Sequence, residues 1–368
     1  MSCTRPLVRF SDGEVRSLKE YLAYGKKRDQ LGSIPEGPEW PESFQNRLLR
    51  KIKSEGAALI PCGHCAGCKL YSRSSWANRM EMELPYHDNA WFLTLTYDDE
   101  NIPYRYTWDT GTGEIITENY SLKYDDLQGF WKRLRRYIEY HKLGNNKIMY
   151  YAAGEYGGQT HRPHYHAIVY DLPIKMEDLT VYKKERGHVY YNCKWIEKIW
   201  GNGFVVISAA TWNSMSYTAG YTAKKVYGKE GKEFYKELGI LPERPMMSTK
   251  PAIGAAYYYD HAAEIYEKDQ IQLKNGRRVK PPRYFDKLFD LEHSNAKPLT
   301  DEECLTIEDT TKKAESEELK AIKRERRRIA NDALFAQLKQ TGLTMQEYYN
   351  LKDKKMQEKM NKLIRKEI

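Results

Sequence analysis

The order of apolar segments between residues 91 and 226 is the feature that most restricts the fold of this chain. Segments rich in aromatic and β-branched residues indicate strands, and segments with a 3.6-residue period indicate helices. The predicted strands are Trp91–Tyr97, Ile148–Ala153, His164–Tyr170 and Phe204–Ser208, and the predicted helices are Asp125–Tyr140, Trp195–Trp200 and Thr211–Val226. Consecutive strands joined by a short loop pair antiparallel. The order therefore predicts an α+β domain with an antiparallel sheet, helices on one face, and the split β-α-β pattern of ferredoxin-like folds.

Around this core the sequence divides into four parts. Residues 1–85 are a loop-rich segment that ends in a cysteine-rich turn and a helix from Leu70 to Leu84, and residues 86–230 hold the core. Within the core, residues 98–120 are a polar excursion with a Gly111-Thr112-Gly113 turn. Residues 231–297 are a Pro- and Tyr-rich extension in which Asn275-Gly276 predicts a hairpin. Residues 298–368 form a highly charged tail that we expect to be helical.

The composition fits a nucleic-acid partner without requiring one. The 368 residues carry a net charge of +9 and include 30 Tyr, so cations for phosphates and rings for bases are both abundant. A solvated basic surface explains the same numbers equally well. No stretch approaches the roughly 18 apolar residues that span a bilayer, and the first residues lack the apolar segment of a secretion signal. We therefore expect no membrane partner and a cytoplasmic chain whose thiols are reduced.

Three cysteines predict a structural zinc site. Cys62, Cys65 and Cys68 have C-x-x-C-x-x-C spacing, which six randomly placed cysteines would produce about 0.001 times. Zinc requires four ligands, so one more is needed. Cys3 is the preferred fourth ligand because the N-terminal segment has little else to hold it. The other candidates are Cys193, Cys304 and His64. The alternative is a set of buried free thiols or an oxidised pair.

Two histidines predict a second, catalytic metal site. His164 and His166 are two apart on a predicted strand, so both imidazoles point to the same face. Nine histidines give such a pair about 0.2 times by chance, so the pair alone is a weak signal. Glu155 ends the neighbouring antiparallel strand and can add a carboxylate oxygen. Two imidazoles and a carboxylate leave positions open for substrate, as Mg²⁺ or Mn²⁺ acting on a phosphate requires.

Two tyrosines are candidate nucleophiles. Tyr217 and Tyr221 are four apart on a predicted helix, and Lys224 follows on the same side. With 30 tyrosines, such spacing arises about twice by chance, and it occurs twice, the other pair being Tyr120 and Tyr124. The position of this helix, after the histidine strand, carries the prediction. A tyrosine attacks a phosphodiester when a cation or metal stabilises the phenolate, and Lys224 is the candidate cation. The alternative is a tyrosine pair packed in the core.

Three motifs occur in an order typical of one known family. They are FLTLTYDD (Phe92–Asp99), GEYG with RPHYH (Glu155, His164–His166), and YTAGYTAKK (Tyr217–Lys225). Together they resemble the His-hydrophobe-His rolling-circle replication initiators, and most closely those of microviruses of the gokushovirus branch. PCGHCAGC (Pro61–Cys68), Cys3 and PPRYFDKL (Pro281–Leu288) add to the likeness, which extends over residues 1–290.

The chain departs from this family at two places. Gly220 stands where relatives often carry a Lys between the two tyrosines, so one phosphate contact is expected to be missing, whereas Lys224 keeps the second Lys position. The segment Pro251–Gly254 also differs at one residue from the Pro-Gly-Ile-Gly of the family, a change that we interpret as structural.

The resemblance implies a five-stranded, RNA-recognition-like nickase core. His164, His166 and Glu155 would hold a divalent cation against the scissile phosphate. Tyr217 or Tyr221 would attack the viral origin strand, leaving a 5′-phosphotyrosine and a 3′-OH primer, and the second tyrosine would later release a closed single-stranded circle. The implied partners are single-stranded DNA, double-stranded origin DNA, and the DNA polymerase and helicase of a bacterial host, in its cytoplasm.

Two other classes of protein remain open. One is a nucleic-acid-binding module without catalysis, in which the cysteine turn and the basic helix only grip DNA. The other is a related enzyme, a single-strand transposase or a plasmid relaxase. Transposases of this type are usually much shorter, and relaxases usually present three histidines in the metal motif.

Overall fold

The computed structural model describes most of the chain, in two compact units. The described residues are 3–9, 15–18, 58–185, 187–224, 228–293 and 316–367. One unit is built on Ser72–Lys287, and the other joins the N-terminal segment to the C-terminal one. Within the described residues, no helix combines the length and the apolar character needed to cross a membrane.

The larger unit is built on a seven-stranded antiparallel sheet, so the expectation of five strands is wrong. The strands, in their order across the sheet, are β12 (Pro245–Met247), β7 (Met149–Tyr156), β8 (Pro163–Tyr170), β4 (Ala90–Tyr97), β11 (Gly203–Ala209), β10 (His188–Asn192) and β9 (Thr180–Glu185). The central four are the predicted apolar strands. The added ones lie at the edges: β12 is three residues long, and every residue of β9 is exposed. Strands without a buried face have no apolar alternation that would reveal them.

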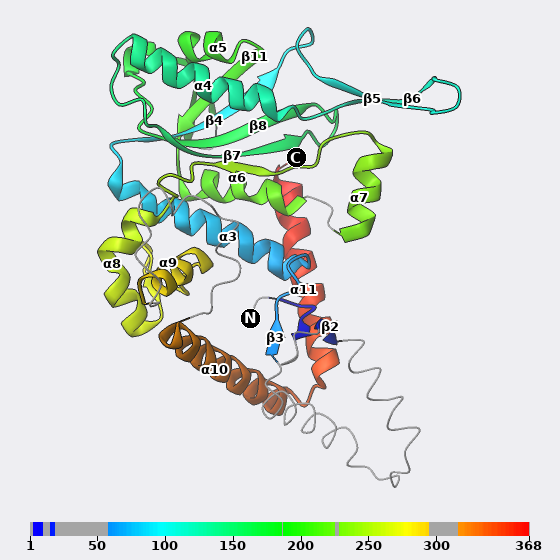
Figure 1. Cartoon of the computed structure of the whole chain (residues 1–368), viewed down its shortest axis with the longest axis vertical. Helices are drawn as coiled ribbons and strands as arrows, with labels where there is room; N and C mark the ends of the chain where they lie inside the picture. Colours follow the sequence, from blue (N-terminus) through cyan, green and yellow to red (C-terminus); the bar gives the residue numbers. More distant parts are fainter. Residues whose placement is uncertain are drawn as a thin grey trace. The chain divides into compact units, whose positions relative to one another are not determined.

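Helices cover both faces of the sheet, which corrects the expectation of one covered face (Figure 1). On the first face α4 (Tyr124–Tyr140) and α5 (Lys194–Trp200) pack on the main core. The predicted stripe of α4 is buried there, namely Leu127, Phe130, Trp131, Leu134 and Ile138. On the second face lie α6 (Trp212–Lys224) and α3 (Ala66–Glu83), whose Ala77, Met80, Met215 and Ala219 share a second apolar cluster with β7 and β8.

Two hairpins and several short helices complete the larger unit. The polar excursion forms a hairpin of β5 (Tyr104–Trp108) and β6 (Ile115–Tyr120), which the sequence predicted only as a turn. The hairpin predicted at Asn275-Gly276 is confirmed as β13 (Ile271–Gln272) and β14 (Arg278–Val279), with Gly276 at a φ of +76°. The remaining elements are η1 (Leu84–Tyr86), η2 (Met176–Asp178), α7 (Gly228–Glu237), α8 (Ala255–Lys268) and α9 (Arg283–His293), the last of which runs past Lys287.

The second unit brings the two ends of the chain together. Its three-stranded sheet has the order β2 (Val15–Ser17), β1 (Leu7–Arg9), β3 (Ala58–Ile60). The described part of the tail forms two helices, α10 (Glu317–Thr341) and α11 (Met345–Glu367). A small apolar core joins these elements, namely Val8, Leu18, Leu59, Leu338, Met345 and Tyr349. The tail is therefore part of the packing of the N-terminal sheet.

Candidate active site and metal centres

Pairing of β7 with β8 brings Glu155, His164 and His166 together. Glu155 lies directly opposite His164, and His166 is two residues further along β8 on the same face. Glu155 Oε2 lies 3.1 Å from His164 Nε2 and 3.0 Å from His166 Nε2. Glu155 and His166 are buried, and His164 is half-buried. The three residues that the sequence grouped from two separate motifs thus share one point.

This triad has donor chemistry that suits a divalent cation. One oxygen and two imidazole nitrogens lie within 4.8 Å of one another. Ligands at right angles around Mg²⁺, each about 2.1 Å from the ion, lie about 3.0 Å apart. The observed separations of 3.0 and 3.1 Å match this edge, although they also suit hydrogen bonds from the imidazoles to the carboxylate. Glu155, His164 and His166 fit a magnesium or manganese ion.

The neighbouring strand β4 fixes the orientation of His166. Thr94 lies directly opposite His166, and its Oγ1 is 3.1 Å from His166 Nδ1. The Phe92 ring stacks on the imidazole with 5.7 Å between centroids. A hydrogen bond to the second ring nitrogen selects the tautomer that leaves Nε2 available to a metal. The sequence analysis missed Thr94, although the alternation of FLTLTY places its hydroxyl on the histidine face.

Both tyrosines of α6 lie against His166. The centroid of the His166 ring is 5.2 Å from that of Tyr217 and 4.7 Å from that of Tyr221, and the two tyrosine rings are 4.7 Å apart. Tyr217 is half-buried, whereas Tyr221 is 1% exposed and stacks on the imidazole at 14°. Burial, followed by the charge of Glu155, raises the pKa of Tyr221 well above its ordinary value. Of the two phenols, Tyr217 is therefore the more accessible.

A cation that the sequence analysis missed reaches this helix from α3. Arg73 donates from Nε to Ser216 Oγ over 2.9 Å. A Cβ atom on Gly220 would lie only 3.1 Å from Arg73 Nη1, so the guanidinium occupies the space beside this glycine. No local sequence signal links residues 73 and 220, which only the packing of α3 on α6 brings together. Lys224 is the last residue of α6, and its side chain lies outside the described part of the structure.

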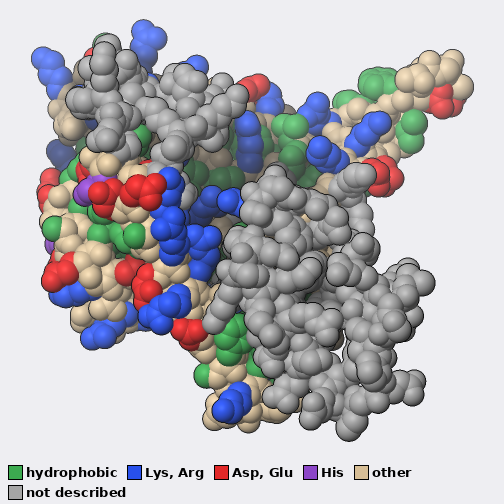
Figure 2. Space-filling model, turned by 60° about the horizontal axis from the view of Figure 1, so that its bottom comes forward, with side chains coloured by type: hydrophobic (Ala, Val, Ile, Leu, Met, Phe, Trp, Pro, Cys, Tyr) green, Lys and Arg blue, Asp and Glu red, His purple; other side chains and the backbone are tan. Residues whose placement is uncertain are grey.

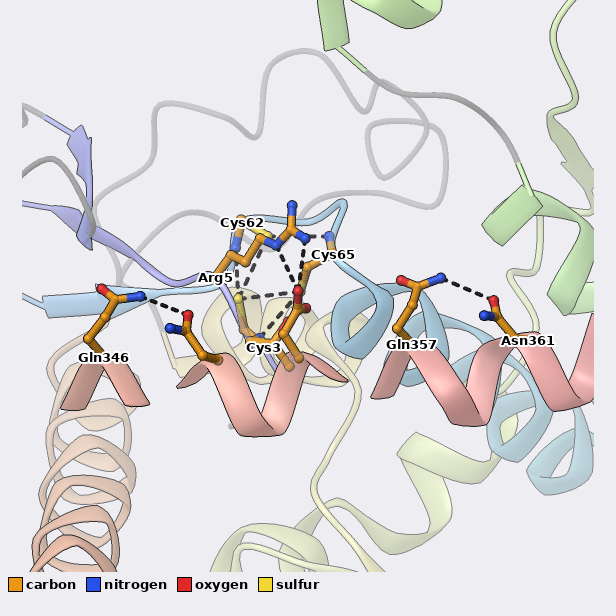
Figure 3. Close-up of polar contacts among 10 residues, drawn as sticks. Cys3, Arg5, Cys62, Cys65, Gln346, Gln357 and Asn361 are labelled. Atoms are coloured by element: carbon orange, nitrogen blue, oxygen red, sulfur yellow. Dashed lines mark hydrogen bonds and ion pairs between the residues drawn. The ribbon is translucent and has the colours of Figure 1, made fainter. Parts of the chain in front are cut away.

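The cysteines form a second cluster, in the N-terminal unit (Figure 3). Cys3, Cys62, Cys65 and Cys68 have sulfur atoms within 4.8 Å of one another. The Cys3 sulfur is 3.7 Å from that of Cys62 and 3.8 Å from that of Cys65. Four sulfurs around Zn²⁺ at about 2.3 Å lie about 3.8 Å apart in a tetrahedron. These four cysteines therefore fit a structural zinc ion.

The other candidates for the fourth ligand lie elsewhere or cannot be assessed. His64 is exposed, and its Nδ1 is 2.9 Å from the carbonyl oxygen of Cys62. Cys193 is buried in the main core of the larger unit, at the start of α5. Cys304 lies outside the described residues. Within the described chain, Cys3 is the residue that completes the group.

Helix α11 is attached to the segment that carries Cys3 (Figure 3). Asp353 accepts hydrogen bonds from the hydroxyl of Thr4 and from Arg5, whose Nη2 lies 2.8 Å from Asp353 Oδ2. Arg5 is largely exposed, so this ion pair adds little stability by itself. Its position next to Cys3 nevertheless fixes the register of the N-terminal segment against the helix.

Comparison with known proteins identifies the class. Residues 90–226, which hold most of the sheet, the triad and α6, match the family model of the phage replication-associated protein ORF2. The chain is 34% identical to the replication-associated protein ORF2 of Spiroplasma virus 4 over 239 residues, which are 63% of this chain and 68% of the relative. This chain therefore belongs to the microvirus replication-associated proteins, a family of replication initiators.

Two further relatives have the same description. The replication-associated protein ORF4 of Chlamydia phage 1 is 30% identical over 250 residues, which are 64% of this chain and 57% of that protein. The replication-associated protein VP4 of Bdellovibrio phage phiMH2K is 28% identical over 249 residues, 66% of this chain and 72% of the relative. No solved structure matches the chain. These relatives give this protein a role in phage replication.

We predict that the cysteine cluster binds about one zinc ion per chain. Cys3→Ser should weaken zinc binding by at least about tenfold, because a hydroxyl replaces the fourth thiolate, whereas Cys3→His should retain the ion. Elemental analysis and competition with a chromogenic chelator measure both. Cys193→Ser is the matched control and should leave the zinc content unchanged. Zinc-free protein with all four thiols titratable in the native state would refute the site.

Proposed function

We propose that this protein is a metal-dependent, site-specific endonuclease that nicks the viral origin strand and starts rolling-circle replication. The observation that carries the proposal is the contact of two tyrosine rings with the histidine of a metal-binding triad, at 5.2 and 4.7 Å from His166. A nucleophile beside metal ligands is the arrangement that phosphodiester transfer requires. The replication-associated names of the relatives agree with this activity.

The triad would position the scissile phosphate. Glu155, His164 and His166 would hold Mg²⁺ or Mn²⁺, which when bound supplies Lewis-acid polarisation of a phosphate oxygen. Thr94 keeps the His166 ring in place, and Phe92 covers one side of it. Together these two residues limit the movement of the imidazole while DNA binds and leaves.

The tyrosines would carry the covalent chemistry. The phenolic oxygen attacks phosphorus, the bond from phosphorus to the 3′ oxygen breaks, and the proton that the phenol loses is balanced by the one the 3′ oxygen gains. The products are a 5′-phosphotyrosine and a 3′-OH that primes synthesis. After one circuit the second tyrosine cuts the regenerated origin, and the released 3′-OH attacks the first phosphotyrosine. The phosphotyrosine keeps the energy of the broken bond, so closing the circle needs no ATP.

Two cations would stabilise the charge that develops in this reaction. Lys224 follows Tyr221 by one helical turn, and Arg73 lies beside Gly220 between the tyrosines. Relatives often carry a lysine at the position of Gly220. We propose that the guanidinium of Arg73 takes over the phosphate contact of that lysine, reaching the same place from α3.

The setting of this activity would be the cytoplasm of a bacterial host. The DNA partners would be the double-stranded origin and the displaced single strand, and the protein partners the host helicase and DNA polymerase that extend the 3′-OH. A binding module without catalysis explains the family match less well, because it has no need of a tyrosine pair on a metal-binding triad. A relaxase is disfavoured because the triad contains two histidines and a glutamate.

Loss of a triad histidine should abolish nicking but not DNA binding. We predict that His164→Ala or His166→Ala lowers the rate of origin nicking by about 100-fold or more, since the ligands of the activating ion are lost. Glu155→Ala should have a smaller effect. Binding should persist because most affinity comes from contacts with the DNA backbone. Gel-based nicking and fluorescence anisotropy test the two parts, and His188→Ala, at an exposed position near the edge of the sheet, is the control. Full nicking by either histidine variant in Mg²⁺ would exclude the assignment.

Each tyrosine should support some first-strand cleavage, and neither alone should complete the cycle. We expect Tyr217→Phe and Tyr221→Phe to nick, the double variant to be inactive, and both single variants to release no closed circles. Mass spectrometry of the DNA-linked peptide identifies the nucleophile. In the unaltered protein we expect the link mainly on Tyr217, since Tyr221 is buried. A link outside Tyr217–Tyr221, or closed circles from a single variant, would contradict the mechanism, and Tyr182→Phe serves as the control.

The roles of the two cations can be separated by a rescue experiment. Lys224→Ala should slow both cleavages, and Arg73→Ala should slow cleavage by about 10- to 100-fold, since one stabilising charge is lost in each case. Gly220→Lys should restore much of the rate in the Arg73→Ala background, where the space beside position 220 has been vacated. In the presence of Arg73 the same lysine must displace the guanidinium. If Gly220→Lys rescues nothing while Arg73→Ala unfolds at the ordinary temperature, Arg73 is not the replacement cation.

A further inference from the structure

The β5–β6 hairpin carries an exposed row of aromatic side chains that the proposed reaction does not use. Tyr104, Tyr106 and Trp108 are 45%, 42% and 55% exposed, and Ile115 and Ile116 on the second strand are 51% and 63% exposed. Figure 1 shows the hairpin extending away from the sheet, and Figure 2 shows hydrophobic side chains along it. Large apolar side chains gathered on a projecting arm indicate a binding surface.

The hairpin has one supported face and one open face. Thr107 pairs with Thr117 across the strands, and both lie close to Gly239, in the segment that follows α7. Asn119 donates to the carbonyl oxygen of Leu238 over 2.9 Å. Side chains alternate along a strand, so the aromatic residues at 104, 106 and 108 share the opposite face. The rings are thus presented to solvent by a hairpin that is held from behind.

The row of rings leads back to the catalytic strand. Tyr104 lies against Tyr120, with 5.0 Å between ring centroids, and the guanidinium of Arg162 is 6.0 Å from the Tyr120 ring. Arg162 donates to the carbonyl oxygen of Tyr97 over 3.0 Å. Arg162 lies two residues before His164. A polymer seated on the rings would therefore approach the metal-binding triad next to a cation.

We infer that this hairpin binds single-stranded DNA next to the cleavage site, with bases stacked on Tyr104, Tyr106 and Trp108. Alternate residues of a strand are about 6.8 Å apart, a separation that suits an extended polynucleotide, not a stacked one. Aromatic stacking accepts every base, because each base has a π-face. This inference rests on the proposed function, to which it adds the way in which the substrate strand is held.

The charges of the hairpin allow this occupant. Arg105 lies between the rings, and Arg162 and Lys123 lie near the base of the hairpin. Two of its acidic groups are engaged within it: Asp109 accepts the amides of Gly111 and Thr112 at 2.8 and 2.9 Å, and Glu118 accepts the hydroxyl of Tyr106 at 3.3 Å.

The test measures DNA binding without cleavage, in the Tyr217→Phe/Tyr221→Phe protein with a chelator present. The probe is fluorescein-labelled oligothymidylate of about 16 nucleotides. Tyr106→Ala with Trp108→Ala should weaken binding at least about tenfold, and Tyr106→Phe with Trp108→Phe should preserve it. Loss of stacking removes no phosphate contact, so the slope of log affinity against log salt should not change. Tyr140→Ala, which removes an 81% exposed tyrosine from α4, is the matched control.

The outcomes separate this inference from the nickase proposal. Unchanged affinity in the alanine pair, or a loss equal to that of Tyr140→Ala, would overturn DNA stacking, and the rings would then be a surface for a protein partner. A loss that the phenylalanine pair does not rescue would also overturn it. None of these measurements depends on tyrosine attack, so a failure of nicking leaves the result interpretable.

Discussion

The register between β7, β8 and β4 is the constraint on which the candidate site depends. It sets Glu155 opposite His164, and Thr94 opposite His166, all on the face covered by α6. A slip of one residue in either pairing would turn these side chains to the opposite face, into the apolar core beneath α4. The core prevents this slip, because Leu93, Leu95 and Tyr165 would then leave it. Packing on one face therefore maintains chemistry on the other.

Burial gives this cluster its energetic character. Glu155 is 7% exposed and His166 is 5% exposed, so neither has bulk water to solvate a charge. A buried carboxylate is costly unless partners compensate it, and here a single oxygen meets two imidazoles. The site is polar at its centre and enclosed by aromatic rings, those of Phe92, Tyr217 and Tyr221. Such a setting strengthens electrostatic contacts with a phosphate compared with those in water.

The sequence predicted what local patterns encode and missed what packing creates. The four central strands have buried faces and so reveal themselves by apolar residues, whereas the exposed β9 and the three-residue β12 leave no such pattern. Metal-ligand spacing grouped Cys62 with Cys65 and Cys68, and chain length alone could not exclude Cys3, which the fold brings within 3.7 Å of Cys62. Arg73 had no signal, since its meaning depends on a glycine in a distant helix. Motifs carry the ligands of a site, and helix packing supplies the residues around them.

The two tyrosines are not equivalent in this structure, and the difference matters for a reaction that uses both. Tyr217 meets His166 and Phe92 edge-on and remains partly open, whereas Tyr221 lies flat on the imidazole and is buried. Attack by Tyr221 requires its ring to leave that stack, which costs roughly 0.5–1.5 kcal/mol in ring contact and more in burial. Tyr221 lies in the last turn of α6, one turn from its end at Lys224, so a displacement of that turn suffices. A phosphotyrosine on Tyr217 would bring a charged group against the same turn and favour that displacement. Under the proposed cycle, the first cleavage would itself prepare the second nucleophile.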